Sequence, residues 1–228
     1  MFADYKQIEL RMLAFYMSCA GHPSMTDAVK AGKDLHEETA RGVYNLSAFA
    51  TPTEEQRDVA KVCNFLMVYG GGTPALTKTL DISFPAAKKL LQAFHATWPG
   101  IAVVQAQIDM RLETRGYVTT LWGRHLHPES AHKALNALVQ GCSADLMKAA
   151  LVKVQRYLLT REFTSHIVSS VHDEMILDCV EAELLELAYS LPTLMSHPPI
   201  AAVIPIGVDI EISRTNWAEK IPYTQENH

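Results

Sequence analysis

A long block of helical patterns lies between two strand-like regions, and this order constrains the fold more than any other feature of the sequence. Residues 1–10 read as the end of a strand that enters a helix. The stretches that follow show helical spacing of apolar residues between Gly, Pro or Ser/Thr/Asp boundaries, at 24–31, 34–44, 53–69, 84–97 and 101–114. Strand patterns return only after Gly116. This order predicts an α+β fold whose sheet is interrupted by a helical insertion.

The second half of the chain predicts two hairpins and two further helices. Residues 117–122 are rich in β-branched and aromatic side chains and read as a hairpin arm that ends at Gly123. Residues 131–159 read as one long helix, which Gly141 would break. Two apolar runs, 165–171 and 175–180, are separated only by His172, Asp173 and Glu174, so we expect a hairpin with acids at its tip. An amphipathic helix at 181–196 and a closing strand at 206–212 follow.

Composition excludes several classes of protein. With 228 residues, 48% hydrophobic and 20% charged, the chain is neither disordered nor of low complexity. Apolar runs stay well short of the roughly 18 to 20 residues of a membrane helix, and charged residues interrupt the start of the chain, so neither a membrane nor an export signal is expected. The four cysteines lie far apart without a C-x-x-C pair, which favours a reducing cytoplasm over a disulfide framework or zinc ribbon.

The net charge of −5 hides an uneven distribution. From Asp173 to the end the chain has 10 acids and 2 bases, a net of −8, so residues 1–172 carry a net of +3. The total net charge argues weakly against a nucleic-acid partner. The net positive charge of residues 1–172 does not argue against one.

The segment 53–70 combines a helix start with a regular ridge of side chains. Thr53 and Gln56 have the spacing of a capping box. Two cations and then two aromatics recur every four residues on one helix face: Arg57, Lys61, Phe65 and Tyr69. Cations near a helix N-terminus are unfavourable unless an anion such as a triphosphate binds there, and the aromatics could stack on a base. An amphipathic helix with a buried aromatic pair and solvated cations explains the pattern equally well.

Two acids from distant parts of the chain form the second candidate feature. Asp4 and Asp173 each stand in a strand-like context. Carboxylates are hard oxygen ligands for Mg²⁺, and two of them can hold a pair of ions for in-line phosphoryl displacement. Taken singly, each acid is more often a polar turn or strand-end residue.

Three motifs occur in order along the chain. They are D-Y-K-Q-I-E-L-R at 4–11, R-x3-K-x3-F-x3-Y-G at 57–70 and V-H-D-E at 171–174. They resemble motifs A, B and C of family A DNA polymerases, the DNA polymerase I type of bacteria and many phages. Similar family segments fall at 34–40 (DLHEETA), 116–124 (GYVTTLWGR), 136–145 (NALVQGCSAD) and 216–217 (NW).

The resemblance implies an antiparallel palm sheet interrupted by helical fingers, with flanking helices: 1–18 and 129–228 as palm, 19–128 as fingers. It implies two catalytic Mg²⁺ ions, with Mn²⁺ as a substitute, bound by Asp4 and Asp173 with the Tyr5 carbonyl and Glu174 assisting. Arg57, Lys61 and His36 would grip the triphosphate, and Lys61 would also protonate the leaving pyrophosphate.

The remaining roles concern the nucleotide and the DNA. Phe65 would flank the incoming sugar and base, and Tyr69 would stack on the template side. Glu9 resembles the steric gate that excludes a ribose 2′-hydroxyl, and Gln7 and Tyr5 would also lie at the nucleotide. The residues that resemble primer-template contacts are Asn136, Gln140, His172, Arg124 and Tyr69.

The same residues distinguish two related classes of polymerase. Single-subunit RNA polymerases of the phage type share the R-x3-K and Y-G pattern, but they lack a Glu in motif A and typically carry Ser where Glu174 stands. The resemblance therefore implies dNTPs and primer-template DNA as substrates. Lys6 and His132 depart from the family pattern, which leaves the surroundings of the metal site and one DNA contact open.

Family members carry a thumb, an upper palm and often an exonuclease domain before motif A. The resemblance does not extend to these parts, so we expect the C-terminal part of a split or truncated enzyme, cytoplasmic, bacterial or phage-encoded, and completed by a second chain. Two other classes remain open: a catalytically silent nucleotide- or DNA-binding remnant, and a metal-dependent phosphohydrolase that uses Asp4 and Asp173.

Overall fold

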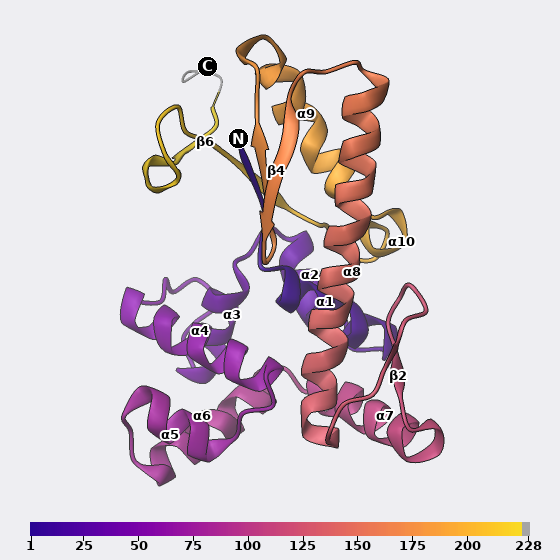
Figure 1. Ribbon diagram of the computed structural model, residues 1–228. Coiled ribbons are helices and arrows are strands. Elements are labelled where there is room, and N and C mark those ends of the chain that lie inside the picture. The colour runs from indigo at the N-terminus through magenta and orange to yellow at the C-terminus, as the bar shows by residue number, and fades with distance from the viewer. Residues whose placement is uncertain (225–228) are drawn as a thin grey trace. The chain divides into compact units, whose positions relative to one another are not determined.

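The computed structural model describes residues 1–224, in which a run of helices, α1 to α7, separates the first strand from the others (Figure 1). The strands are β1 (Phe2–Tyr5), β2 (Val118–Thr119), β3 (His125–Leu126), β4 (His166–Val171), β5 (Glu174–Asp178), β6 (Val208–Ile212) and β7 (Ile221–Pro222). The α-helices are α1 (Ile8–Cys19), α2 (Ser24–Lys30), α3 (Leu35–Val43), α4 (Glu54–Val68), α5 (Thr73–Leu80), α6 (Phe84–Thr97), α7 (Gly100–Arg115), α8 (Ala131–Thr160), α9 (Leu184–Met195) and α10 (Pro198–Ala201). Two short 3₁₀ turns are η1 (Glu181–Glu183) and η2 (Trp217–Glu219).

The chain forms two compact units, which we call the sheet unit and the helical unit. The sheet unit consists of Met1–Ile8 with the chain from Ser143 onward, and the helical unit is Glu9–Cys142. The expected α+β fold is confirmed, because an antiparallel sheet is interrupted in the sequence by a helical insertion. The boundaries that the resemblance gives for palm and fingers stay a prediction.

The sheet unit is built on a five-stranded sheet of order β4-β5-β1-β6-β7, in which all neighbours are antiparallel. The four-residue strand β1 lies at its centre, with β5 on one side and β6 on the other. Ala3 is fully buried and Tyr5 nearly so, and the Tyr5 hydroxyl donates to the Met195 carbonyl at 2.6 Å. Burial of the face that carries Ala3 and Tyr5, together with hydrogen-bonded neighbours along both edges, therefore fixes the central strand although it is short.

Strands β4 and β5 form the expected hairpin, with a two-residue connection rather than three. His172 and Asp173 make the connection, and Glu174 already belongs to β5. His172 has φ +55°, the left-handed region that few side chains adopt readily. A strained, exposed residue thus stands directly beside Asp173 at the hairpin tip.

Helices α3, α4 and α6 of the helical unit begin with side-chain caps. Thr53 and Gln56 form the expected capping box at α4, while Asp34 caps α3 and Ser83 caps α6. Helices α3, α4, α5 and α6 pack on one another. Gly42 of α3 permits close packing, because a Cβ there would stand 2.1 Å from Oγ1 of Thr97 on α6.

Helices α5 and α8 differ from the sequence expectations. Helix α5 was not predicted; it begins with Pro74 in its first turn, after an uncapped glycine, so the usual polar start signal is missing. Helix α8 runs unbroken through Gly141, where the missing side chain leaves room for Leu126 and Arg124 instead of a kink.

Within residues 1–224, no helix has the length and apolarity to cross a membrane.

Candidate functional site

The register of the sheet aligns three acids across three strands. Asp4 of β1 is opposite Glu174 of β5 and opposite Asp209 of β6. Residues directly opposite one another project from the same face of a sheet, so these carboxylates share one face. Asp173 lies next to them, and its carbonyl accepts a hydrogen bond from the Tyr5 amide at 3.2 Å. The fold therefore brings the two acids of the first and third motifs into one cluster.

Negative charge accumulates around Asp4 in this cluster. Burial, the largest cause, and the negative charges of Asp173, Glu174 and Asp209 together raise the pKa of Asp4 to about 6, against the opposing effect of Lys220. A divalent cation would relieve this repulsion, and hard carboxylate oxygens are the ligands it prefers. The residues therefore fit a Mg²⁺ site. In residues 1–224 no three His, Cys, Asp or Glu side chains are grouped to hold a metal by themselves, so phosphates and water would complete the shell.

Glu174 is neutralised by a lysine that the sequence analysis did not single out. Lys220 forms a close ion pair with Glu174, and the two side chains are only 19% and 11% exposed. The same ammonium lies 3.8 Å from Glu211 and 4.5 Å from the centre of the Phe2 ring. Glu174 is thus already held in place, which restricts the assisting role that the resemblance implies for it.

Lys6, which departs from the family pattern, also has a local partner. Its ammonium lies 2.6 Å from the carboxylate of Asp209, and its amide donates to the Gly207 carbonyl at 2.9 Å. The Lys6 and Asp209 side chains are about half exposed, so the pair contributes little stability by itself. It does reduce the negative charge that faces Asp4.

We expect Lys220→Met to destabilise the sheet unit by about 2 to 4 kcal/mol, because the largely buried Glu174 would lose its counter-charge. Urea unfolding measures the loss. The double variant Lys220→Met/Glu174→Gln should recover part of it, since it removes the orphaned charge as well. Equal losses in the single and double variants would contradict the ion pair as the cause.

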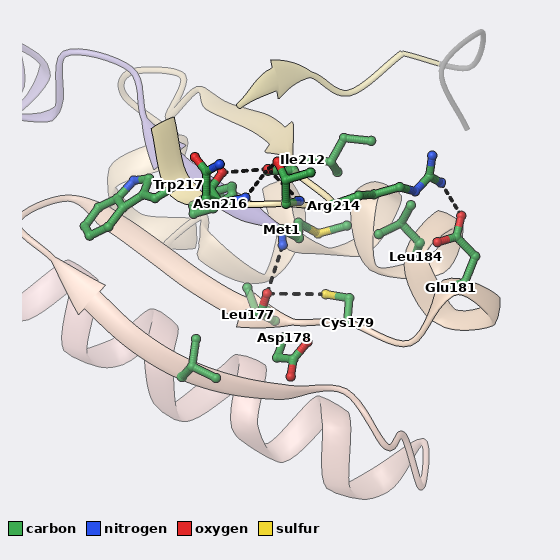
Figure 2. Close-up of a pocket in the computed structure, with 14 residues that line it drawn as sticks. Met1, Leu177, Asp178, Cys179, Glu181, Leu184, Ile212, Arg214, Asn216 and Trp217 are labelled. Atoms are coloured by element: carbon green, nitrogen blue, oxygen red, sulfur yellow. Dashed lines mark hydrogen bonds and ion pairs between the residues drawn. The ribbon is translucent and has the colours of Figure 1, made fainter. Parts of the chain in front are cut away.

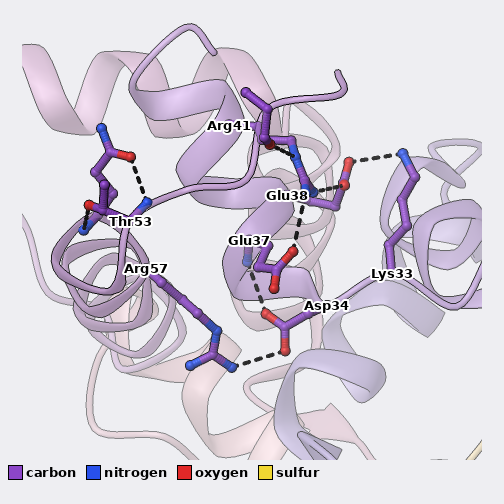
Figure 3. A network of polar contacts seen from close by, with 9 residues as sticks. Lys33, Asp34, Glu37, Glu38, Arg41, Thr53 and Arg57 are labelled. Carbon is purple, nitrogen blue, oxygen red and sulfur yellow. Dashed lines mark hydrogen bonds and ion pairs between the residues drawn. The ribbon is translucent and has the colours of Figure 1, made fainter. Parts of the chain in front are cut away.

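The cations of the predicted triphosphate site gather in the helical unit at the start of α3. Asp34, the N-cap of α3, accepts from the Glu37 amide at 2.9 Å and from Nη2 of Arg57 at 3.1 Å (Figure 3). These contacts hold Arg57 of α4 beside the N-terminus of α3. Lys61 is exposed one turn further along α4, and both cations act on the His36 ring. The three predicted phosphate-binding residues therefore lie together.

His36 is buried at 4% exposure, yet it is bonded through only one ring nitrogen. Nδ1 lies 2.9 Å from Nδ2 of Asn64, and within residues 1–224 Asn64 is the sole hydrogen-bond partner of the ring. Burial, the largest cause, and the positive charges of Arg57 and Lys61 lower the pKa of His36 to about 4 against the opposing effect of Asp34, so the ring is neutral at pH 7.

The two aromatics of the ridge continue from this ring. The Phe65 ring lies 5.8 Å from that of His36 and is stacked 6.1 Å from that of Tyr69. Tyr69 is 43% exposed, so the alternative in which both aromatics belong to a core is wrong for Tyr69. An open aromatic face next to a cationic cluster suits a nucleotide.

The buried, neutral state of His36 predicts a pH dependence of stability. Its pKa is about 4 in the fold and about 6.5 when unfolded, so its contribution is complete above pH 6.5 and is lost as the pH falls toward 4. We expect a loss of about 3 kcal/mol over this interval, measured by urea unfolding of the chain. His36→Gln, which cannot titrate, should remove this part of the slope, and an unchanged slope would assign the titration to another group.

The other predicted site residues are dispersed over several elements. Glu9 stands in the first turn of α1, and its Oε2 is buried without a hydrogen-bond partner among the described residues. Gln7 precedes α1 with φ +49°. On α8, Asn136 has a buried Oδ1 without a partner in the described chain, and Gln140 is exposed four residues later. Arg124 donates to the Gly141 carbonyl at 2.9 Å.

The structure therefore forms two groups of predicted residues, one acidic in the sheet unit and one cationic in the helical unit. That the two groups face one another in a single site stays a prediction. Three neighbours with evident roles were missed by the sequence analysis: Asp209, Lys220 and Asn64. Asn64 had a signal, since it lies inside the ridge segment directly before Phe65.

A cavity of about 450 Å³ in the sheet unit is separate from the acidic cluster (Figure 2). Its lining includes Leu177, Cys179 and Trp217, and an ion pair joins Arg214 to Glu181 at its rim. The Trp217 ring stacks on that of Phe2 at 6.4 Å. No predicted site residue lines this cavity, so it is not part of the candidate site.

Comparison with known proteins identifies the family. The profile of DNA polymerase family A matches residues 1–219. The chain is 36% identical to DNA polymerase I of Chloroflexus aurantiacus, 33% to the thermostable DNA polymerase I of Thermus filiformis and 32% to the DNA polymerase of Mycobacterium phage L5. These alignments cover 96%, 95% and 94% of this chain but 24%, 26% and 33% of the relatives, so the chain spans about a quarter to a third of their length.

The fold is similar to a solved relative as well. The POL domain of Pol1 from M. smegmatis, in complex with DNA primer-template and dNTP, matches with a TM-score of 0.78 and 26% identity. The match covers 91% of this chain and 38% of that one. Profile, relatives and fold agree, and the chain belongs to DNA polymerase family A.

Proposed function

We propose that this chain carries the nucleotidyl-transfer centre of a DNA-directed DNA polymerase, which joins a dNTP to the 3′-hydroxyl of a primer. The observation that supports it best is the acidic cluster, in which β1 and the β4–β5 hairpin bring Asp4 and Asp173 together on one sheet. Family membership supports the same reaction class.

In this proposal Asp4, Asp173 and the Tyr5 carbonyl hold two Mg²⁺ ions, for which Mn²⁺ can substitute. When bound, the ions supply Lewis-acid activation of the primer hydroxyl and stabilise the leaving oxygen. The protein side chains position the substrates and supply the positive charge that binds the triphosphate. Arg57 grips the triphosphate with a forked contact, and Lys61 donates a proton to the leaving pyrophosphate. The negative charge around Asp4 and the cations around His36 suit these two tasks.

The substrate contacts follow the resemblance. Glu9 excludes a 2′-hydroxyl and thereby selects deoxynucleotides, with Gln7 beside it; Phe65 flanks the sugar and base, and Tyr69 stacks on the template side. Asn136, Gln140, His172 and Arg124 contact the primer-template. We assign residues 1–18 and 129–228 to a palm and 19–128 to fingers.

The chain spans only part of its relatives, so thumb and upper-palm functions must reach it from outside residues 1–228. We propose that they come from a further segment of the same polypeptide or from a second chain, in the cytoplasm of a bacterial or phage-infected cell. A silent remnant and a phosphohydrolase remain the rival functions.

A primer-extension assay distinguishes the polymerase, the silent remnant and the phosphohydrolase. The chain is assayed with Mg²⁺, dNTPs and a primer-template, alone and mixed with a thumb-bearing fragment of a relative. Extension in the mixture supports the polymerase. Nucleotide binding without extension in either reaction favours the remnant, and dNTP hydrolysis without primer favours the phosphohydrolase.

A further inference from the structure

A buried chain of hydrogen bonds runs through the helical unit and ends on His36. Nε1 of Trp98 lies 2.9 Å from Oγ1 of Thr39, which lies 3.0 Å from Oδ1 of Asn64. Nδ2 of Asn64 in turn lies 2.9 Å from Nδ1 of His36. All four residues are at most 4% exposed. We call this chain of four side chains the Trp98 relay.

The Trp98 indole sets the order of donors and acceptors along the relay. The indole of Trp98 can only donate, so Thr39 accepts from it and has one hydroxyl proton left. That proton can go to Asn64 or to the Leu35 carbonyl, which is 2.8 Å away. The Leu35 carbonyl is already an acceptor within the α3 ladder, whereas Oδ1 of the fully buried Asn64 has no other donor facing it among the described residues.

With Oδ1 of Asn64 occupied by Thr39, its amide group donates to Nδ1 of His36. A neutral imidazole carries one proton, so an accepting Nδ1 requires the proton to be on Nε2. The low pKa of His36, about 4, supports a ring that is neutral at pH 7. Nε2 then offers a hydrogen-bond donor, where the other tautomer would offer a lone pair and repel an anionic oxygen.

We propose that Asn64, oriented by Thr39 and Trp98, is a positioning residue that fixes His36 as the Nε2-protonated neutral tautomer, a donor for the triphosphate of an incoming nucleotide. The triphosphate part rests on the proposed function, whereas the tautomer does not. The nearby cations Arg57 and Lys61 would neutralise the negative charge of the phosphates. The relay adds a neutral donor whose direction is fixed before the ligand arrives.

The tautomer is read directly from ¹⁵N chemical shifts of the histidine ring in the intact chain, with His36 assigned by comparison with His36→Gln. At pH 7 we expect a protonated Nε2 and an unprotonated Nδ1. Asn64→Asp offers only acceptors to Nδ1, so its His36 ring should carry a proton on Nδ1 and titrate with a higher pKa. A wild-type spectrum with the proton on Nδ1 overturns the relay.

Matched variants separate positioning from packing. Trp98→Phe keeps most of the indole volume but removes the donor, and Thr39→Val keeps its shape but removes the hydroxyl. In both, the His36 spectrum should lose its single tautomer. Cys63→Ala changes an equally buried neighbour on α4 that has no part in the relay, and its spectrum should match the wild type. A shift of equal size in Cys63→Ala would assign the effect to packing.

The ligand part is tested by dNTP titration of the same proteins. Thr39→Val should weaken dNTP binding about tenfold, but should have no further effect in a His36→Ala background, because the relay acts through His36. An additive loss in the double variant overturns the role of the relay in binding. If the spectra are as expected and the wild type shows no dNTP affinity, the proposed function fails and the tautomer assignment stands.

Discussion

Asp173→Asn is expected to lower single-nucleotide addition at least about 10³-fold, the largest effect on activity that the structure predicts. The substitution keeps the size of the side chain but removes the charge that would hold a divalent ion beside Asp4. Extension by the chain mixed with a thumb-bearing fragment measures the rate. Mn²⁺ binding to the chain alone gives a second measurement, which does not depend on the fragment and should be weakened as well.

The matched control is Asp178→Asn, an exposed acid on the same strand β5. It should leave both the rate and Mn²⁺ binding close to the wild type. Because the charge of Asp173 raises the pKa of Asp4, Asp173→Asn should also bring that pKa down from about 6 toward its ordinary value, as carboxyl ¹³C titration would show. Full activity in Asp173→Asn would remove this acid from the catalytic centre.

Gly70→Ala is expected to cost about 3 kcal/mol in the free energy of unfolding of the helical unit. Gly70 ends α4 in a Schellman motif: its amide donates to the Met67 carbonyl at 3.2 Å, and the Gly71 amide donates to the Leu66 carbonyl at 2.6 Å. Its φ is +73°, and a Cβ there would lie 2.3 Å from the backbone oxygen of His132. A methyl group must therefore both strain the turn and displace the start of α8.

Gly116→Ala separates these two costs. Gly116 ends α7 with nearly the same φ, +76°, but a Cβ there would meet nothing within 4 Å. It should lose only about 1 kcal/mol, the ordinary cost of a left-handed alanine. Urea unfolding of both variants gives the comparison. Equal losses would mean that the chain accommodates the contact between Gly70 and His132.

Local patterns predicted most of the fold, because caps and periodicity act over a few residues. The capping box at Thr53 and the acidic hairpin tip at Asp173 are examples, and both are present. Helix α5 escaped prediction because Gly72 supplies no cap and Pro74 reads equally well as a turn residue. The two-residue connection at His172 also escaped, since a left-handed histidine is not suggested by composition.

The partners within the candidate site were much less predictable than its main residues. Asp209 and Lys220 meet the acidic cluster only through the β1–β6 register and the return of the chain after it, neither of which is a local property. Asn64 was difficult to predict for another reason. Its position on α4 was visible, but its partner His36 lies on another helix, so only packing shows what its amide does.

The central strand also has a consequence for biosynthesis. Asp4 pairs with strands that begin about 170 and 200 residues later, so β1 cannot pair with β5 and β6 until they have left the ribosome. At roughly 5 to 20 residues per second that wait is on the order of ten seconds or more. The helical unit, with contacts among consecutive helices, can form meanwhile. A newly made chain therefore passes through a period with a folded helical half and no acidic cluster, when an unpaired apolar strand is open to chaperones and to misassembly.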